Sequence, residues 1–230
     1  MSRFRIAPIA YDGWKFIIAF GLLGFSFLFF GVWFAKLMGV LLLFLAGFCV
    51  AFFRDAEREI SAGDILSPAD GTVTEVATVD GEGYGQGRVI RIFLSIFDGH
   101  VQRAPVPGRV KAVQYSPGLF LDARDPRAAF ANESNSVEIE TARGAVMVKQ
   151  IAGLIARRIV CWVREDDDLE MGERIGLIRF GSQVDLYVPR DVEIAIKEGD
   201  KVLAGITVVG HWPKINAVEP AMAVSGGSAL

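Results

Sequence analysis

The sequence predicts a mainly β soluble domain that follows an apolar helical hairpin at the N-terminus. Two long stretches near the N-terminus, Phe16–Ala35 and Leu37–Phe53, contain no charged residue. From Arg54 onward, apolar and polar residues alternate in short runs, which is the period of a half-exposed strand. Glycine and proline clusters separate these runs, as turns do, and no long amphipathic helix lies among them.

The alternating runs place ten strands in the soluble domain. Between two of them, the segment Phe120–Phe130 is either a short helix or a loop. The expected strands are Thr72–Val79, Arg88–Leu94, Gly108–Tyr115, Ser136–Glu140, Val146–Ile151, Ile159–Val163, Gly176–Phe180, Val184–Val188, Glu193–Ile196 and Lys201–Val209.

Two segments in the later half of the chain resemble each other, residues 170–176 and residues 197–205. Each places an acidic turn before a short strand. Repeats of this kind are common in small barrel-sandwich folds such as the biotinyl and lipoyl domains, although two unrelated β-turns give the same pattern. We therefore expect the soluble domain to be a barrel-sandwich of the lipoyl or biotinyl kind.

The two apolar stretches are long enough for a pair of membrane helices. A spanning helix needs about 20 apolar residues, which the first stretch reaches and the second nearly does. A secretion signal is disfavoured because the stretches are too long and no small-residue cleavage site follows them. A pair of buried core helices would show a polar face, which is missing here. Basic residues flank the pair, at Arg3, Arg5, Lys15, Arg54 and Arg58.

These basic flanks should keep both ends of the hairpin, and the domain after it, on the cytoplasmic side of the cell membrane. The turn around Gly31–Gly39 shortens both legs, so the hairpin either spans the bilayer or dips into it. We divide the chain into a membrane-associated helical hairpin, residues 1–53, and a β-rich domain, residues 54–230.

Composition argues against several kinds of site and partner. The soluble part carries 20 Lys and Arg against 26 Asp and Glu and has no basic stripe, so nucleic acid is not an expected partner. Cys49 and Cys161 lie in different regions and suggest no disulfide. The sequence contains no phosphate loop, dinucleotide fingerprint or metal-ligand spacing, so we expect no metal site.

Three residues could carry chemistry. His100 follows a strand in a turn-rich segment, and its near-neutral pKa suits acid–base work, although a lone histidine is often structural. Asp70 lies in an Asp-Gly turn, where aspartate is also common for local reasons. Ser182 stands in a Gly-Ser pair between apolar strands, where neither residue is favoured. Its hydroxyl could be a nucleophile activated by His100 and Asp70, or could attack the carbonyl of Gly181.

Seven short segments, taken in order, resemble the phosphatidylserine decarboxylase family in its short form. The resemblance covers roughly residues 52–209, and its most diagnostic segment is the last, because members of the family cut themselves there. The segments are 53–55 (FRD), 67–71 (SPADG), 97–108 (FDGHVQRAPVPG), 132–135 (NESN), 150–153 (QIAG), 172–176 (GERIG) and 180–182 (FGS).

The resemblance implies a pyruvoyl-dependent proenzyme. Ser182 would attack the Gly181 carbonyl with help from Asp70 and His100, as in a serine-protease triad. Breakdown of the ester would leave a covalent pyruvoyl cofactor at position 182 and two chains from one precursor, β (residues 1–181) and α (residues 182–230). This electron sink would allow a membrane phosphatidylserine to lose carbon dioxide and become phosphatidylethanolamine, with His100 helping to return a proton.

One departure from the family pattern affects the site residues. Arg103 stands where longer bacterial members carry a second histidine, so we expect His100 to be the single base and Arg103 to be available for the phosphate or carboxylate of the substrate. In the segment 132–135, relatives often have Asn-Glu-Arg where this chain has Asn-Glu-Ser.

Other interpretations stay open from the sequence alone. One is a membrane-anchored, non-catalytic lipoyl-like binding module. Another is a membrane serine hydrolase that uses Ser182, His100 and Asp70. A third keeps the decarboxylation but changes the lipid to a related one with a serine head group. A homo-oligomer is also compatible with the sequence.

Overall fold

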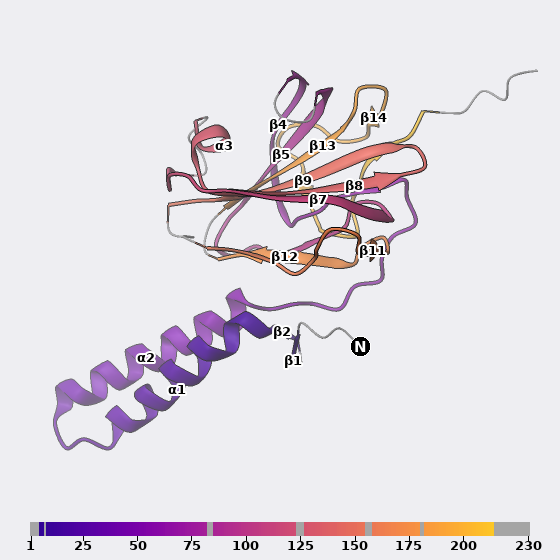
Figure 1. Cartoon of the computed structure of the whole chain (residues 1–230). Coiled ribbons are helices and arrows are strands. Elements are labelled where there is room, and N and C mark those ends of the chain that lie inside the picture. Colours follow the sequence, from indigo (N-terminus) through magenta and orange to yellow (C-terminus); the bar gives the residue numbers. More distant parts are fainter. Residues whose placement is uncertain are drawn as a thin grey trace, which may run out of the picture.

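The computed structural model describes residues 5–6, 8–81, 85–122, 127–154, 158–179 and 182–213. A two-helix hairpin protrudes from a β-rich domain (Figure 1). The predicted mainly β fold with an N-terminal apolar hairpin is therefore confirmed.

The hairpin consists of α1 (Trp14–Leu28) and α2 (Trp33–Phe52). The helices approach closely where two glycines face each other, since a Cβ on Gly39 would lie 2.8 Å from the carbonyl oxygen of Gly24. Small residues at such a crossing are typical of helices that pack in lipid. A short strand pair, β1 (Arg5–Ile6) and β2 (Ile9–Ala10), and a 3₁₀ turn at Tyr11–Gly13 precede α1.

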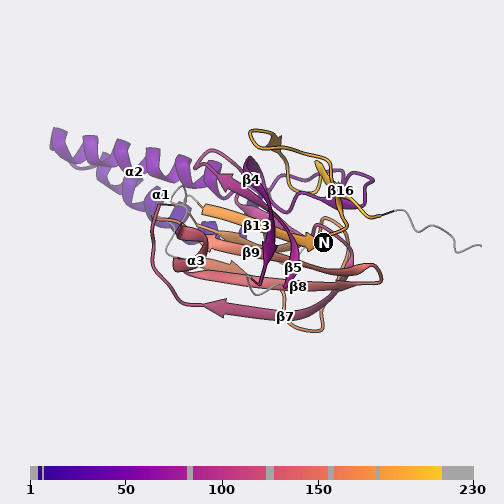
Figure 2. The ribbon, with the colours of Figure 1, turned by 90° about the horizontal axis from the view of Figure 1, so that it is seen from above.

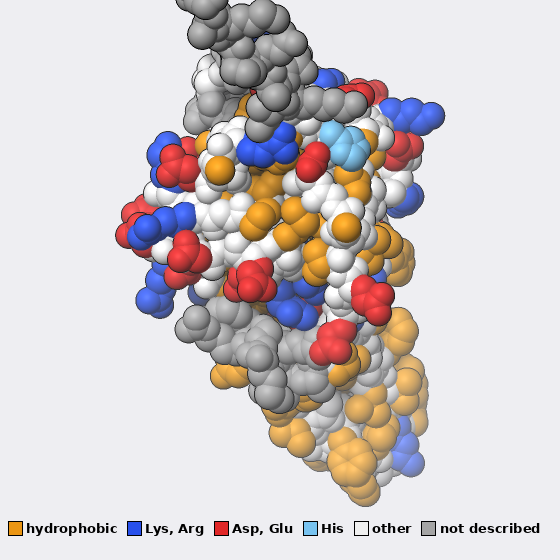
Figure 3. All heavy atoms as spheres, turned by 90° about the vertical axis from the view of Figure 1, so that its right-hand side faces the viewer, with side chains coloured by type: hydrophobic (Ala, Val, Ile, Leu, Met, Phe, Trp, Pro, Cys, Tyr) orange, Lys and Arg blue, Asp and Glu red, His pale blue; other side chains and the backbone are white. Residues whose placement is uncertain are grey.

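Apolar side chains cover the outside of the hairpin, whereas charged side chains are scattered over the domain above it (Figure 3). Phe29 and Phe44, for example, are 75% and 71% exposed. By length and composition, the segments Tyr11–Leu28, which is α1 with the turn before it, and Trp33–Phe52 could each cross a membrane, which weakly suggests that the chain associates with one.

The main body of the domain is an eight-stranded antiparallel sheet that curls into a half-barrel (Figures 1 and 2). Strand β13 lies between the hairpins β4–β5 and β8–β9, so it joins two units of the sheet. In spatial order the strands are β11 (Asp168–Leu169), β7 (Gly108–Ser116), β8 (Ser134–Thr141), β9 (Gly144–Ala152), β13 (Ser182–Pro189), β5 (Gln86–Leu94), β4 (Gly71–Asp80) and β15 (Lys201–Val202).

Two three-stranded sheets complete the domain. The sheet β10–β12–β6 lies between the large sheet and the hairpin (Figure 1). The main hydrophobic core includes Ile92, Val148 and Val184 from the large sheet and Ile178 from the small one. The six strands are β10 (Ile159–Cys161), β12 (Arg174–Ile178), β6 (Val101–Arg103), β14 (Glu193–Ile194), β16 (Val208–His211) and β3 (Ile65–Leu66).

The base of the hairpin is packed into the domain. Phe52 and Phe53, at the end of α2, are each 1% exposed and share a second hydrophobic cluster with Val101 of β6 and Leu177 of β12. The amide of Ala10 donates a hydrogen bond of 2.8 Å to the carbonyl of Phe53, which closes this base.

Some expected elements differ from the structure. The single strand expected at Lys201–Val209 is wrong, because a turn separates β15 from β16. In this turn the amides of Ile206 and Thr207 donate to the carbonyl of Leu203, and Gly205 has a φ of +72°. The short strands β3, β6 and β11 were not expected, since two or three residues show no periodicity. Of the ambiguous segment 120–130, only α3 (Ala128–Ala131) is helical among the residues described.

Candidate active site

Ser182 is the first residue of β13 and lies opposite Leu94 of β5 and Ala152 of β9. Because strand residues alternate, Ser182 shares the core-facing side of β13 with Val184 and Leu186. Its side chain is completely buried, and its Oγ has no hydrogen-bond partner among the described residues. A buried hydroxyl left unpaired costs about 1–3 kcal/mol, so this arrangement calls for an explanation other than stability.

His100 ends the loop that leaves β5. Within this loop the amide of Asp98 donates to the carbonyl of Ser95, and the Asp98 carboxylate accepts a hydrogen bond of 2.8 Å from the amide of Ser95. The imidazole is 1% exposed, and its Nδ1 lies 2.9 Å from the Asp98 carbonyl oxygen. Since a carbonyl only accepts, Nδ1 carries the proton in the neutral ring and Nε2 presents a lone pair.

This Nε2 is also buried without a partner among the described residues. Burial lowers the pKa of His100 to about 4, so the ring is neutral at pH 7 and able to act as a base. The His100 carbonyl accepts a hydrogen bond from the amide of Ile178, four residues before Ser182. Four extended residues reach at most about 14 Å, so the backbone of Ser182 lies within this distance of Ile178, the residue that binds the His100 carbonyl.

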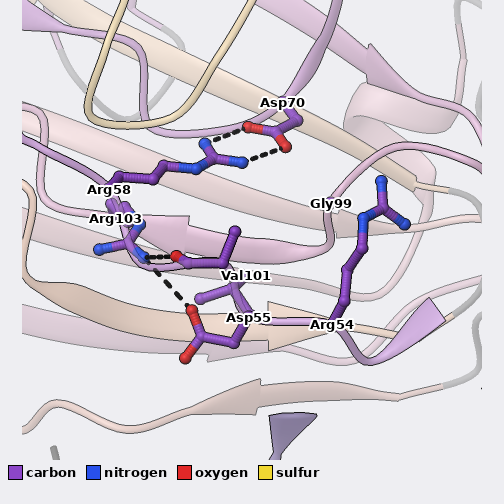
Figure 4. Close-up of a pocket in the computed structure, with 8 residues that line it drawn as sticks. Arg54, Asp55, Arg58, Asp70, Gly99, Val101 and Arg103 are labelled. Atoms are coloured by element: carbon purple, nitrogen blue, oxygen red, sulfur yellow. Dashed lines mark hydrogen bonds and ion pairs between the residues drawn. The ribbon is translucent and has the colours of Figure 1, made fainter. Parts of the chain in front are cut away.

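Asp70 lies in the turn before β4, beside the loop of His100. Arg58 binds its carboxylate with two hydrogen bonds of 2.6 Å (Figure 4), and the amide of Ala204 donates a third of 2.8 Å. The hydrogen bonds to Asp70 raise the pKa of Arg58. A Cβ on Gly99 would lie 2.4 Å from the Asp70 Oδ2, so only glycine fits there. Asp70 thus lies next to His100, but the hydrogen bond of the imidazole goes to Asp98.

Arg103 is buried beneath the linker that follows α2. Its guanidinium donates to the carbonyls of Gly172 and Ala56, both at 3.0 Å, and lies 3.2 Å from the Asp55 carboxylate (Figure 4). Asp55 also accepts a hydrogen bond of 2.6 Å from Arg174. Burial, and then the charge of Arg174, lower the pKa of Arg103 to about 10. The donors of Arg103 are therefore directed to protein groups.

A small cavity separates these arginines from the loop of His100. Its volume is about 10 Å³, which is enough for about one water molecule. Figure 4 shows the arginines and aspartates that line it. The lining residues are Arg54, Asp55, Ala56, Arg58, Asp70, Gly99, Val101 and Arg103.

A chain of buried amides supports the site from below. Gln102 donates a hydrogen bond of 2.8 Å to the carbonyl of His100, Gln150 donates one of 2.9 Å to Gln102, and Asn135 donates one of 3.0 Å to Gln150. Asn132 donates a hydrogen bond of 2.8 Å to the carbonyl of Ala152, the residue opposite Ser182. These amides tie strands β6, β8 and β9 together around the site.

No pattern in the sequence assigns a role to Arg58, Asp55 or the buried amides. Gln102, Gln150 and Asn135 lie within segments that carry the family resemblance, so their position in those segments was the available signal. Gly181 lies outside the described residues, and only the serine side of the predicted cleavage bond is placed.

Comparison with known proteins decides the family. The family model described as phosphatidylserine decarboxylase matches residues 45–210, which is most of the chain. The chain belongs to the phosphatidylserine decarboxylase family. A protein of this family from Geotalea uraniireducens (strain Rf4), a phosphatidylserine decarboxylase proenzyme, is 43% identical over 216 residues, which cover 92% of this chain and 100% of the relative.

Membership of the phosphatidylserine decarboxylase family confirms the predicted family and the predicted enzyme class, a carboxy-lyase. The match begins at residue 45, within α2, so it includes the last turns of the hairpin as well as the β-rich domain. The end of α2 is therefore part of the segment that the family shares.

Proposed function

We propose that the chain converts phosphatidylserine to phosphatidylethanolamine with a pyruvoyl group made from its own Ser182. The observation that carries this proposal is that the Ser182 Oγ and the His100 Nε2 are both buried without a hydrogen-bond partner among the described residues. A hydrogen bond between them would satisfy both, and it is the contact that a serine nucleophile needs from its base. The name proenzyme, given to the relative from Geotalea, is consistent with such processing.

Self-cleavage begins when the His100 Nε2 accepts the Ser182 proton. The Oγ attacks the Gly181 carbonyl carbon, a C–O bond forms, and the C–N bond to residue 182 breaks as its amine takes up the proton. The ester then eliminates, so that the Cα proton of residue 182 and the Gly181 carboxylate leave. Hydrolysis of the resulting enamine consumes one water, releases ammonia and leaves a ketone at residue 182. The β chain ends at Gly181 and the α chain begins at residue 182.

The surroundings of Ser182 fit such a group. Ser182 lies in the core between Leu94 and Ala152, so bulk water is excluded from its side chain. When present, the pyruvoyl carbonyl supplies an electron sink for the electrons released as carbon dioxide leaves. His100, which is neutral at pH 7 because burial lowers its pKa to about 4, can accept and return a proton beside it.

Asp70 and Arg103 contribute to this function in different ways. Asp70, fixed by Arg58, places a negative charge near His100 that favours the transient imidazolium. For Arg103 to meet the phosphate or carboxylate of the lipid, it would have to exchange its hydrogen bonds with Asp55 and Ala56 for the substrate.

The hairpin would hold the enzyme on the cytoplasmic face of the cell membrane, where the head group of a phospholipid meets the protein. Its apolar exterior and the basic residues beside both ends support this orientation.

Mass spectrometry of the purified protein tests the proposal. We expect two chains, residues 1–181 and 182–230, with a carbonyl at the start of the second. Release of carbon dioxide from phosphatidylserine in mixed micelles should be lost after treatment with hydroxylamine, which consumes a carbonyl.

Ser182→Ala is the matched control and should give one uncut chain without activity. A wild-type protein that decarboxylates phosphatidylserine as a single intact chain would contradict the proposal. So would an intact chain that a fluorophosphonate labels at Ser182, since that result indicates a serine hydrolase.

A further inference from the structure

The last residue of the membrane hairpin touches the predicted base. The ring of Phe52 lies against the imidazole of His100, with their centroids 4.1 Å apart and their planes inclined by 39°. Phe52 is 1% exposed, and its ring also contacts that of Phe53 at 5.1 Å. A residue that the sequence assigns to the anchor is therefore part of the surroundings of His100.

A second contact joins the same two segments. Arg54 donates a hydrogen bond of 2.8 Å to the carbonyl of Ala51 in α2 and one of 2.6 Å to the carbonyl of Phe97 in the loop of His100. Residues 51–54 are thus attached to residues 97–100 at two points, one apolar and one polar. The family match, which begins at residue 45, includes this contact.

The tilt of an imidazole ring needs such a support. The second side-chain torsion of histidine is broad and has no sharp staggered wells, so packing decides the plane of the ring. The hydrogen bond from Nδ1 to Asp98 fixes one atom and still permits rotation about that contact. The ring of Phe52 removes this freedom and thereby sets the direction of the Nε2 lone pair.

We propose that Phe52 is a positioning residue that holds His100 in the orientation needed for self-cleavage, so that the end of α2 is a working part of the site as well as an anchor. The inference rests on the proposed function, because it concerns the same proton transfer from Ser182. It also implies that the functional boundary between hairpin and β-rich domain lies before Phe52, and not after Phe53.

A test uses the full-length chain, pulse-labelled by cell-free synthesis with phospholipid vesicles and then moved into buffers between about pH 4 and 8, a range that includes the ordinary pKa of histidine. Gel separation of the two products over time gives the rate of self-cleavage. Phe52→Leu keeps the site apolar and removes the ring, so we expect cleavage about 10- to 100-fold slower at pH 7. Phe52→Tyr keeps the ring and should cleave at nearly the wild-type rate.

The pH profile separates positioning from a general loss of stability. Wild-type cleavage should fall only as the pH approaches about 4, the pKa to which burial lowers His100. Phe52→Leu lets water reach the ring, so this acid limb should move toward 6.5, the ordinary pKa of histidine. The charged groups facing the ring, Asp98, Asp70 and Arg54, are unchanged in the variant.

Two control variants make the same change, phenylalanine to leucine, at other positions. Phe53→Leu removes an equally buried ring from the same cluster, and Phe44→Leu removes an exposed ring from the same helix. Both should keep the wild-type acid limb, and Phe44→Leu should also keep the wild-type rate. If circular dichroism shows Phe52→Leu to be unfolded, Phe52→Met takes its place, because it fills the site without a ring.

Equal rates and equal acid limbs for Phe52→Leu and the wild type would overturn the inference. The same slowing and the same pH shift in Phe53→Leu would also overturn it, since the cause would then be loss of packing in general. A wild-type chain that never cleaves contradicts the proposed function instead, so the two failures can be told apart.

Discussion

The two faces of strand β13 differ in whether their buried polar groups have hydrogen-bond partners. On the core face, the Ser182 Oγ is buried without a partner among the described residues, as is the nearby His100 Nε2. On the other face, the equally buried Asp185 accepts a hydrogen bond of 2.6 Å from Gln183 and lies 3.4 Å from Arg91. Neighbouring residues of this strand thus separate a face whose buried carboxylate is paired from a face whose buried hydroxyl is not.

On the paired face, the strand register places the charged residues opposite one another. Asp185 lies directly opposite Arg91 of β5 and Lys149 of β9, so two cations flank one carboxylate. Lys149 also donates a hydrogen bond of 2.8 Å to the carbonyl of Ala129 in α3, and the Arg91 guanidinium lies 5.7 Å from the centre of the Phe130 ring. A cluster so well satisfied stabilises the fold, whereas unpaired groups are available for chemistry.

The largest expected effect comes from removing the proposed base of Ser182. His100→Phe keeps a ring that can pack on Phe52 but has no nitrogen to accept the Ser182 proton. Self-cleavage should slow by about 10²–10⁴-fold, the usual contribution of a general base. Gel analysis of pulse-labelled protein over time measures it. Cleavage within a few-fold of wild type would show that the orphaned Nε2 is not the base.

On the paired face, the matching change should act on stability instead. Asp185→Leu removes the oxygens that accept from Gln183 and that face two cations, so buried donors are left unpaired and we expect unfolding to become easier by about 1–3 kcal/mol. Urea unfolding in detergent measures it, with Ser182→Ala as the background so that both proteins are uncut. With Ser182 restored, the Asp185→Leu chain should still process itself once folded. Loss of processing in a folded Asp185→Leu protein would remove the contrast between the faces.

The sequence identified the unpaired face better than the paired one. His100 and Ser182 were singled out as candidates because histidine is rare in this chain and Gly-Ser is unusual between strands. Asp185 was missed because its place in an alternating strand predicts a solvent-facing side chain, and only the contacts with α3 and the flanking cations show why it is buried.

Tertiary contacts explain the other omissions. The contact of Phe52 with His100 joins residues 48 positions apart, and an apolar residue at the end of an apolar helix gives no signal of it. The prediction of one strand at Lys201–Val209 was wrong for a local reason. Gly205 adopts a left-handed conformation that ends the strand, but in the sequence it is only a small residue in an apolar run. The long strands of the large sheet, unlike β11 and β15, were predicted well because their alternation is long enough to show a period.

The pH dependence of stability offers a sharper comparison, because burial shifts the pKa of Asp185 on the paired face and the pKa of His100 in opposite directions. Burial raises the pKa of Asp185 from 3.8 to about 6, so its contribution to stability is full below 3.8 and is lost as the pH rises through 6. Burial lowers the pKa of His100 from 6.5 to about 4, so its contribution is full above 6.5 and is lost as the pH falls through 4. As the pH rises, the stability contribution of Asp185 therefore falls while that of His100 rises, over nearly the same pH range.

The uncut Ser182→Ala protein should therefore show a flat stability profile between about pH 4 and 6.5, the pKa values of His100 in the folded and unfolded chain. Adding Asp185→Asn removes the Asp185 titration and leaves that of His100, so the free energy of unfolding should rise with pH across this window by about 3 kcal/mol. Urea unfolding at a series of pH values measures both profiles. A flat profile in the double variant would mean that His100 is not held neutral by burial.

The smallest expected effect compares two adjacent residues directly, in the slowly processed His100→Phe background. Ser182→Ala removes a buried hydroxyl that has no partner, so the folded state should gain up to about 1 kcal/mol. Gln183→Met removes an amide that binds Asp185 at 2.6 Å, so the folded state should lose about 1–2 kcal/mol. Urea unfolding measures the change in the free energy of unfolding for each variant. An increase for Ser182→Ala and a decrease for Gln183→Met would support the division of the strand into a paired and an unpaired face. A loss of stability in Ser182→Ala would mean that the Ser182 hydroxyl has a partner in the folded chain, and that its burial needs no catalytic explanation.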